Sequence, residues 1–162
     1  MLAAQVLAKA AARDGRNVLQ TQAYGAEARG SLTKSEVIIS GDRINFPAAR
    51  KIDVLVAMSQ EAANELVRDL KETGTLVLNS SSVKSVPQTK AKVRSFPITE
   101  TARSRFGDDL YANMVMLGVL LQLAPLAGRE SAEEAIREST PKKAAETNVK
   151  ALAEGMRLVG TE

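Results

Sequence analysis

Two short and nearly uninterrupted apolar runs constrain the fold of this chain more than any other feature. They are "KIDVLVAMS" at residues 51–59 and "TLVLNSSS" at residues 75–82. A strand without alternation between apolar and polar residues is typical of a parallel sheet that is buried on both faces. The segment between them, "QEAANELVRDLKETG" at residues 60–74, has helical spacing, with Ser59 as its cap and Gly74 as its end. The two runs therefore predict neighbouring parallel strands joined by a helix.

The rest of the sequence continues this alternation. Helices are predicted over residues 1–14, 99–107, 113–126, 131–139 and 141–159, and strands over residues 17–23, 32–40 and 90–98. The last of these strands alternates basic with apolar side chains, which is typical of a sheet edge. We therefore predict a single domain, residues 1–162, with an α/β fold in three layers: a mostly parallel sheet flanked by helices. Such domains usually open on a strand, so we expect the first strand to be missing or to be supplied upstream of Met1.

Three predicted helix ends rest on capping signals. Gly15 follows the first helix at the position where a left-handed residue is favoured. Ser131 and Glu134 have the spacing of a capping box. Thr140 is the expected cap of the last helix, and Pro141 occupies its first turn. These signals place the boundaries of three predicted helices.

The chain contains no cysteine and no histidine, and this excludes several kinds of chemistry. Without those ligands it cannot hold an iron–sulfur cluster or a typical zinc ion by itself. A cysteine nucleophile and a serine–histidine pair are excluded as well. The sequence also lacks a glycine-rich phosphate fingerprint, which disfavours an independent nicotinamide enzyme. We therefore assign no catalytic residue and no metal ligand, and expect the chemistry to occur on groups that other molecules supply.

The charge distribution indicates neither nucleic acid nor membrane as a partner. The net charge is +3, and the region 84–105 is the most basic. Two tyrosines, three phenylalanines and no tryptophan provide few platforms for base stacking. The basic region is therefore interpreted as a solvated face or an anion-attracting rim. No apolar run approaches the ~20 residues that span a bilayer, and the first residues make a poor signal peptide, so we expect a cytoplasmic protein without a membrane span.

The stretch "YGAEARGS", residues 24–31, is the first candidate binding site, because it follows a predicted strand. Gly25 and Gly30 allow another molecule to approach the backbone closely. Arg29 offers a planar fork that suits a phosphate or a carboxylate, and Glu27 could orient it. The alternative is an ordinary turn that carries a solvated ion pair.

Two further polar stretches follow apolar elements. Asn79 and Ser80 come at the end of a predicted parallel strand, where ligands bind in α/β sheets. Their alternative role is to make local hydrogen bonds in a turn. Asn113 stands at the head of an apolar helix, whose N-terminus could face an anion, although a plain N-cap is the simpler interpretation.

The motifs "YGAEARG", "SEVIIS", "DVLVAMSQ", "GTLVLNSS" and "ANMVMLGVLL" together resemble, in this order, the gamma subunit of 2-oxoacid:ferredoxin oxidoreductases. The similarity covers nearly the whole chain. Members of the 2-oxoglutarate type are most similar, and the pyruvate and ketoisovalerate types come next. The resemblance implies an enzyme that oxidatively decarboxylates a 2-oxoacid with coenzyme A, giving an acyl-CoA, carbon dioxide and reduced ferredoxin.

The resemblance also implies how the work is divided among subunits. Thiamine diphosphate with Mg²⁺ and the iron–sulfur clusters belong to partner chains, namely the alpha, beta and ferredoxin-like delta subunits, and ferredoxin accepts the electrons. The gamma subunit helps to cover the active site and to receive coenzyme A, and it is not expected to be active alone. The implied coenzyme A contacts are Tyr24, Gly25, Glu27, Arg29, Gly30, Asn79, Ser80 and Asn113.

The sequence departs from the family pattern at several places. Ala26, Ala28 and Ser31 stand where the family usually has proline, methionine and a second glycine. The strand and the glycine-glycine-glutamine-glycine turn that precede "MLAAQVLAKAAA" in the family are absent. Two alternatives to the enzyme subunit stay open at this point: a stand-alone coenzyme- or nucleotide-binding α/β module, and a purely structural subunit whose loops touch no substrate.

Overall fold

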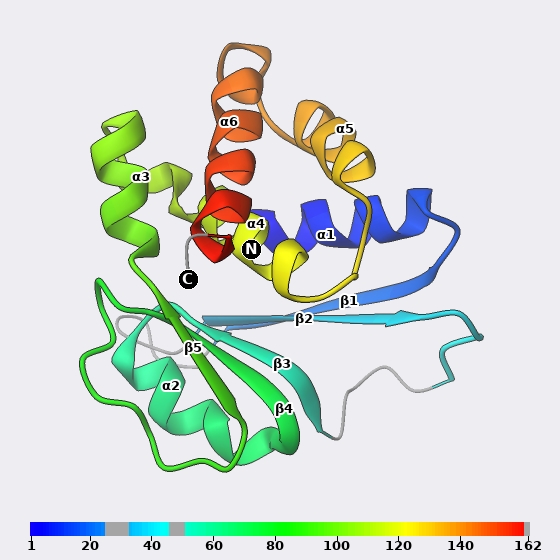
Figure 1. Cartoon of the computed structure of the whole chain (residues 1–162). Helices are drawn as coiled ribbons and strands as arrows, with labels where there is room; N and C mark the ends of the chain where they lie inside the picture. Colours follow the sequence, from blue (N-terminus) through cyan, green and yellow to red (C-terminus); the bar gives the residue numbers. More distant parts are fainter. Residues whose placement is uncertain (25–32, 46–50, 161–162) are drawn as a thin grey trace.

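The computed structural model describes residues 1–24, 33–45 and 51–160. Helices and strands follow one another along the chain in nearly the order that the sequence predicts (Figure 1). The elements are α1 (Leu2–Arg13), β1 (Asn17–Tyr24), β2 (Thr33–Ser40), β3 (Ile52–Ala57), α2 (Gln60–Leu66), η1 (Val67–Asp69), β4 (Leu70–Asn79), β5 (Lys92–Phe96), α3 (Ile98–Phe106), η2 (Asp109–Tyr111), α4 (Ala112–Leu123), α5 (Arg129–Ser139) and α6 (Lys142–Val159).

The parallel sheet has the strand order β3-β4-β5 and lies between two layers of helices. Strand β3 is packed on both faces, as its uninterrupted apolar run predicts. Leu55 and Ala57 join a cluster that includes Ala63 of α2, whereas Val54 and Val56 pack against the main core on the other side. At the opposite edge, β5 carries Lys92 and Arg94, so the prediction of an edge strand is also confirmed. The predicted α/β architecture is therefore correct for this part of the chain.

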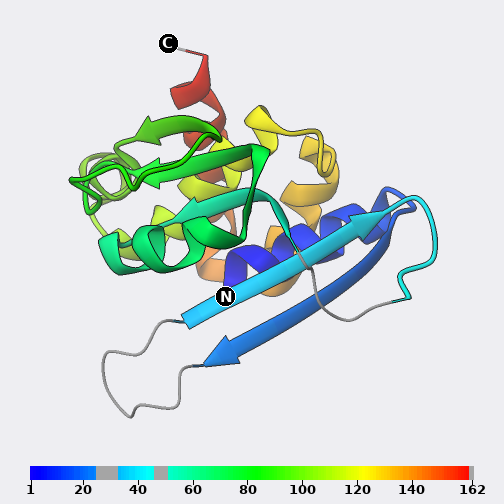
Figure 2. The same ribbon diagram turned by 90° about the horizontal axis from the view of Figure 1, so that it is seen from below.

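Strands β1 and β2 form a separate antiparallel ribbon rather than part of the parallel sheet. Their pairing runs from Asn17 opposite Ser40 to Tyr24 opposite Thr33. Val37 and Ile39 turn toward the main core, and α1 packs along the same ribbon. In Figure 2 the end of the ribbon at Tyr24 and the carboxyl ends of β3, β4 and β5 lie on the same side of the molecule.

The helix that the sequence predicts over residues 60–74 is shorter than expected. Helix α2 ends at Leu66, and strand β4 already begins at Leu70, which pairs with Ile52. The backbone at Gly74 lies so close to β3 that a Cβ there would stand 2.7 Å from the carbonyl oxygen of Asp53. Because pairing with β3 satisfies the backbone hydrogen bonds of this segment, it overrides the helical spacing of the side chains.

Two of the predicted caps are confirmed. The hydroxyl of Ser59 accepts a hydrogen bond from the Ala62 amide at 3.2 Å and begins α2. Gly15 has φ +79°, the left-handed conformation that favours glycine after a helix. Both caps depend only on residues within four positions along the chain, and this is why the sequence predicts them.

The capping box and the Thr140 cap were wrong. Helix α5 begins at Arg129, two residues before Ser131, whose hydroxyl instead donates a hydrogen bond to the Asp14 carboxylate at the end of α1. Thr140 closes α5 rather than opening α6, because its hydroxyl donates to the carbonyl oxygen of Ile136 at 2.8 Å. Pro141 is the residue that directly precedes α6.

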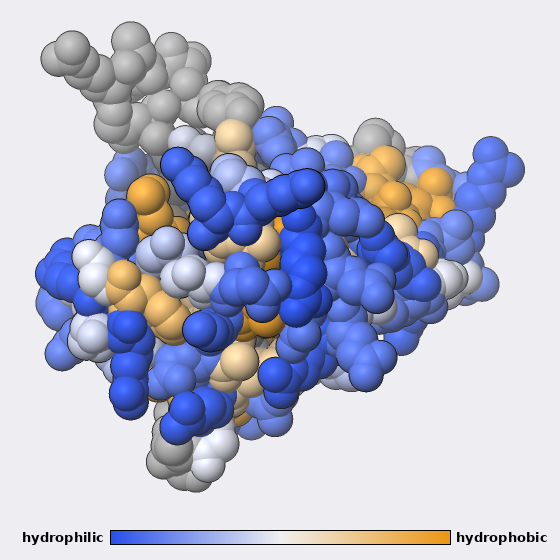
Figure 3. Space-filling view, turned by 90° about the horizontal axis from the view of Figure 1, so that it is seen from above, coloured by the Kyte–Doolittle hydropathy of each residue, from blue (hydrophilic) through white to orange (hydrophobic). Residues whose placement is uncertain are grey.

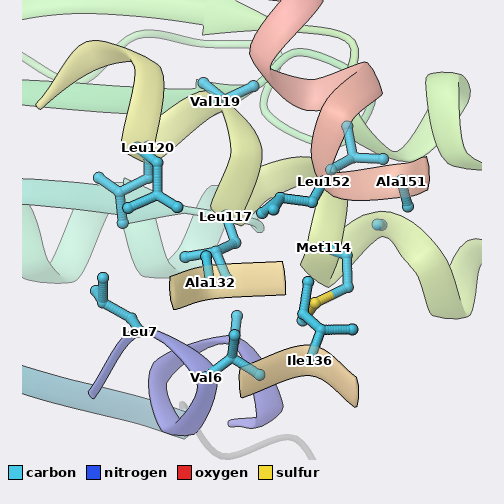
Figure 4. Close-up of a cluster of buried hydrophobic side chains, with 14 of the residues drawn as sticks. Val6, Leu7, Met114, Leu117, Val119, Leu120, Ala132, Ile136, Ala151 and Leu152 are labelled. Atoms are coloured by element: carbon cyan, nitrogen blue, oxygen red, sulfur yellow. The ribbon is translucent and has the colours of Figure 1, made fainter. Parts of the chain in front are cut away.

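The main core is built around α4, which is buried on nearly all sides by α1, α5 and α6 (Figure 4). Leu117 of α4 lies among side chains of these helices, including Leu7, Ala132 and Leu152. Helices α4 and α6 cross at two glycines. A Cβ on Gly118 would stand 2.0 Å from the Leu152 carbonyl oxygen, and one on Gly155 would stand 1.9 Å from that of Val115. The two backbones are therefore in direct contact.

Candidate functional site

The carboxyl end of β4 is organised around the fully buried side chain of Asn79. Its Nδ2 group donates to the hydroxyls of Thr99 at 2.8 Å and Ser82 at 3.3 Å. Its Oδ1 atom accepts from the amides of Thr99 at 3.2 Å and Ser81 at 3.3 Å. A buried amide needs such partners, and here every donor and acceptor is used. Asn79 therefore positions this turn, and its amide has no capacity left for a ligand.

The same turn caps the N-terminus of α3. The residue before α3 is Pro97, which offers no side-chain cap. Instead, the Thr99 amide donates to Asn79, and the Glu100 amide donates to the Ser81 hydroxyl at 3.1 Å. These bonds satisfy two of the amides that a helix start leaves without partners. The sequence offered either ligand contacts or local hydrogen bonds for this turn, and it did not predict the bonds to α3. A helix that starts after proline without a cap of its own was the signal for a cap from a distant segment.

Ser80 is the residue of this turn that keeps a free side chain. Its backbone amide donates to the Phe96 carbonyl oxygen at 2.9 Å, but its hydroxyl forms no hydrogen bond within the described residues. Lys84 folds back so that its ammonium group donates to the Ser80 carbonyl oxygen at 2.9 Å. A free hydroxyl and a positive charge therefore stand together at the carboxyl end of the central strand, a combination that suits an anionic ligand.

The first candidate stretch lies largely outside the described residues. Gly25, Glu27, Arg29 and Gly30 all fall there. Of Tyr24 the structure describes the backbone, which pairs with Thr33 across the ribbon. The strand before this stretch belongs to the antiparallel ribbon, so the expectation that it ends in the parallel sheet is wrong.

Asn113 is not the N-cap of α4, because it is the second residue of the helix and Tyr111 occupies the N-cap position. Its side-chain Oδ1 atom is buried and accepts no hydrogen bond in the described part of the chain. Leaving a buried acceptor unpaired costs about 1–3 kcal/mol, so this atom is open to a donor from outside the described residues. Asn113 follows the turn at the far end of α3, and no described contact joins it to Asn79 or Ser80.

Most of the basic side chains in the region 84–105 have partners within the chain. Lys90 pairs with Glu72 at 2.9 Å, and Arg103 forms two hydrogen bonds with Asp109 at 2.6 and 2.9 Å. These hydrogen bonds lower the pKa of Asp109 and raise that of Arg103. The interpretation of this region as a solvated face is therefore favoured over an anion-attracting rim, except at Lys84.

The described residues show neither a metal-binding cluster nor a membrane-spanning helix. No group of three or more acidic side chains there is arranged to hold a metal ion. Among the helices of residues 1–24, 33–45 and 51–160, none is both long and apolar enough to cross a membrane.

Known proteins resemble this chain over nearly its whole length. Residues 1–158 match the family described as pyruvate ferredoxin/flavodoxin oxidoreductase. The chain is 39% identical over 158 residues to the 2-oxoglutarate synthase subunit KorC of Methanocaldococcus jannaschii, and the match covers 96% of this chain and 84% of that protein.

Solved structures agree with this similarity. The gamma subunit of a keto/oxoacid ferredoxin oxidoreductase from Geobacter sulfurreducens superposes with a TM-score of 0.88 at 36% identity, covering 99% of this chain and 91% of that one. The 2-oxoglutarate:ferredoxin oxidoreductase from Magnetococcus marinus has a TM-score of 0.86 over 99% of this chain and 28% of its own. At 22% identity, this second likeness shows the fold alone.

Proposed function

The chain belongs to the pyruvate ferredoxin/flavodoxin oxidoreductase family, and from this premise we propose that it is the gamma subunit of a 2-oxoacid:ferredoxin oxidoreductase of the 2-oxoglutarate type. The observation that carries the proposal is the 39% identity to a 2-oxoglutarate synthase subunit across 96% of this chain. The assembled enzyme oxidatively decarboxylates 2-oxoglutarate with coenzyme A to succinyl-CoA and carbon dioxide, and it passes two electrons to ferredoxin.

In this proposal the redox groups belong to the partner subunits. Thiamine diphosphate, its Mg²⁺ ion and the iron–sulfur clusters supply the decarboxylation and the electron transfer. This chain offers no cysteine or histidine to such clusters. Its own contribution is to bind and orient coenzyme A, together with the alpha, beta and ferredoxin-like delta subunits.

We assign the contacts with coenzyme A by the chemistry of the available groups. The Ser80 hydroxyl and the Lys84 ammonium can donate to its phosphates, while Asn79 holds their turn in place. Arg29 offers its guanidinium group for a bidentate contact with a phosphate. The same stretch also contains the predicted contacts Tyr24, Gly25, Glu27 and Gly30. Asn113, with its unpaired buried oxygen, can accept from an amide or hydroxyl donor.

Co-expression with the partner subunits tests the function. We expect the purified complex to reduce ferredoxin when 2-oxoglutarate and coenzyme A are both present, and the isolated chain to be inactive. The kcat/KM for 2-oxoglutarate should exceed the values for pyruvate and 3-methyl-2-oxobutanoate. Turnover by the isolated chain would contradict the subunit role, and a preference for pyruvate would contradict the assigned type.

Two substitutions test the coenzyme A contacts. Loss of a hydrogen bond to a charged group costs about 1.5–3 kcal/mol, so Ser80→Ala and Arg29→Ala should each raise the KM for coenzyme A roughly tenfold or more, with the KM for 2-oxoglutarate unchanged. Ser85→Ala is the matched control, because Ser85 lies in the same loop and uses only its backbone groups. If Arg29→Ala leaves the KM for coenzyme A unchanged, the stretch is purely structural.

A further inference from the structure

Two adjoining grooves flank the C-terminal half of α6, and none of the predicted coenzyme A residues is among their lining residues. The larger, with a volume of about 570 Å³, lies between α6, the end of α4 and the start of α5, and its apolar lining includes Leu121, Ala127 and Met156. The smaller, of about 300 Å³, lies between α3 and α6. Both grooves share Ala153 and Arg157, so the surface continues across α6. Such a continuous surface is broader than a site for one small molecule.

The charge on this surface is predominantly positive. Its lining includes the cationic residues Arg105, Arg129, Lys150 and Arg157 and a single acidic residue, Glu154. Lys150 has no ion-pair partner among the described residues.

One carboxylate is shared between two of these guanidinium groups. The side chain of Glu154 is only 15% exposed and contacts Arg105 at 3.2 Å and Arg157 at 3.3 Å. A guanidinium group carries five N–H donors, so each arginine keeps donors that face solvent. One negative charge for two positive charges leaves an excess that a second carboxylate could neutralise.

A related arrangement lies along α5, although Arg137 there also pairs with Glu146 at 2.9 Å. Glu133, 20% exposed, contacts Arg129 at 2.8 Å and Arg137 at 3.8 Å. The half-buried carboxylates hold the guanidinium groups in place before any partner arrives. Such preorganisation of the side chains lowers the conformational entropy cost of binding a partner.

We propose that this surface docks an acidic amphipathic helix of a partner subunit, a proposal that rests on the subunit role argued above. The apolar face of that helix enters the larger groove over Leu121 and Met156, and its carboxylates meet Arg129 and Arg157. Helical walls with an apolar floor suit a helix laid in a groove. Seen from above, the molecule shows mostly hydrophilic side chains with apolar areas between them (Figure 3).

The absence of cysteine from the chain allows a direct test. Ala153→Cys places one thiol between the two grooves, and Gln88→Cys places one on a loop outside them as the control. In the purified complex, we expect maleimide to modify position 153 at least tenfold more slowly than in the isolated chain, and position 88 equally fast in both. A thiol-attached photo-crosslinker at position 153 should capture a helical partner peptide that contains Asp or Glu.

Three outcomes would overturn the proposal: equal modification rates at position 153 in an assembled complex, a captured peptide without acidic residues, or capture of nucleic acid. A chain that does not assemble with the partner subunits at all would instead overturn the proposed function. The two failures are therefore distinguishable.

Charge reversal gives an independent measurement. The double variant Arg129→Glu with Arg157→Glu should weaken the affinity for the partner subunits roughly tenfold or more, and increasingly so at low salt. The control, Lys90→Glu with Lys92→Glu, makes the same change of net charge outside the surface and should stay within about twofold of the wild type. Equal effects of the two double variants would indicate a general dependence on net charge and contradict a specific docking site.

Discussion

The glycine crossing of α4 and α6 gives the sharpest prediction about stability. In Gly155→Ala, the new Cβ would stand 1.9 Å from the carbonyl oxygen of Val115 and 2.8 Å from its carbonyl carbon. Both atoms belong to the backbone of a buried helix, so no flexible side chain can move aside. An ordinary contact requires about 3.4 Å or more, so the two helices must separate by more than 1 Å along this direction.

The expected cost follows from two opposing effects. Overpacking of a tight core typically costs about 1–3 kcal/mol and sometimes more, and this site belongs at the upper end. Replacing glycine by alanine inside a helix returns about 1 kcal/mol. We therefore expect Gly155→Ala to lower the free energy of unfolding by about 2 kcal/mol or more, which for a chain of this size shifts the melting temperature down by roughly 4–8 °C.

Urea unfolding followed by circular dichroism measures this change, with Gly41→Ala as the control. The new Cβ in Gly41→Ala would meet no atom within 4 Å, and Gly41 does not have a positive φ, so alanine there should be neutral or slightly stabilising. If both variants unfold at the same urea concentration, then the two backbones are not in contact and the reasoning is refuted.

Three further predictions concern hydrogen bonds. Asn79→Ala should lower the free energy of unfolding by about 2 kcal/mol or more in urea titration, because the amide of Thr99 loses its acceptor; an unchanged midpoint would contradict the capping role. Hydrogen bonds from the start of α5 lower the pKa of Asp14 from its ordinary value of 3.8, so its stabilising contribution is complete above that pH and is lost as the pH falls further. The wild type should therefore lose stability between pH 5 and pH 2 more steeply than Asp14→Ala in acid titrations, and parallel curves would argue against this role. Ser59→Ala should cost about 1 kcal/mol by removing the cap of α2, which thermal melts can detect, whereas Ser85→Ala should cost nothing measurable.

The sequence predicts the elements whose causes are local. The apolar run around Val54 and Val56 identifies a strand buried on both faces, and Gly15 and Ser59 end or begin helices with partners only a few residues away. The absence of cysteine and histidine excludes an iron–sulfur cluster or a typical zinc ion held by this chain alone, before any fold is known. The resemblance to the gamma subunits is confirmed by the family match over residues 1–158.

In two of the failed predictions, a distant partner decided the outcome. Ser131 has the spacing of a capping box, but Asp14, 117 residues earlier, takes its hydroxyl. Leu70 lies within a helical pattern, but pairing with Ile52 makes it the first residue of a strand. In each case, a tertiary contact gave the polar group a hydrogen-bond partner within the protein. In the predicted local conformation, that partner would not have been available to it.

For the candidate site as well, some features could be predicted from the sequence and others depended on the tertiary structure. The sequence by itself identified Asn79 and Ser80 as polar residues at the end of a buried strand, because strand burial and chain direction are written in the pattern of side chains. Only the tertiary structure decided that the Asn79 amide is fully used in capping α3. It also decided that, among the residues described, the Ser80 hydroxyl and the buried Asn113 oxygen have no hydrogen-bond partner. The donors and acceptors of a side chain are a property of the residue itself. Whether they form hydrogen bonds within the protein depends on which segments the fold brings together.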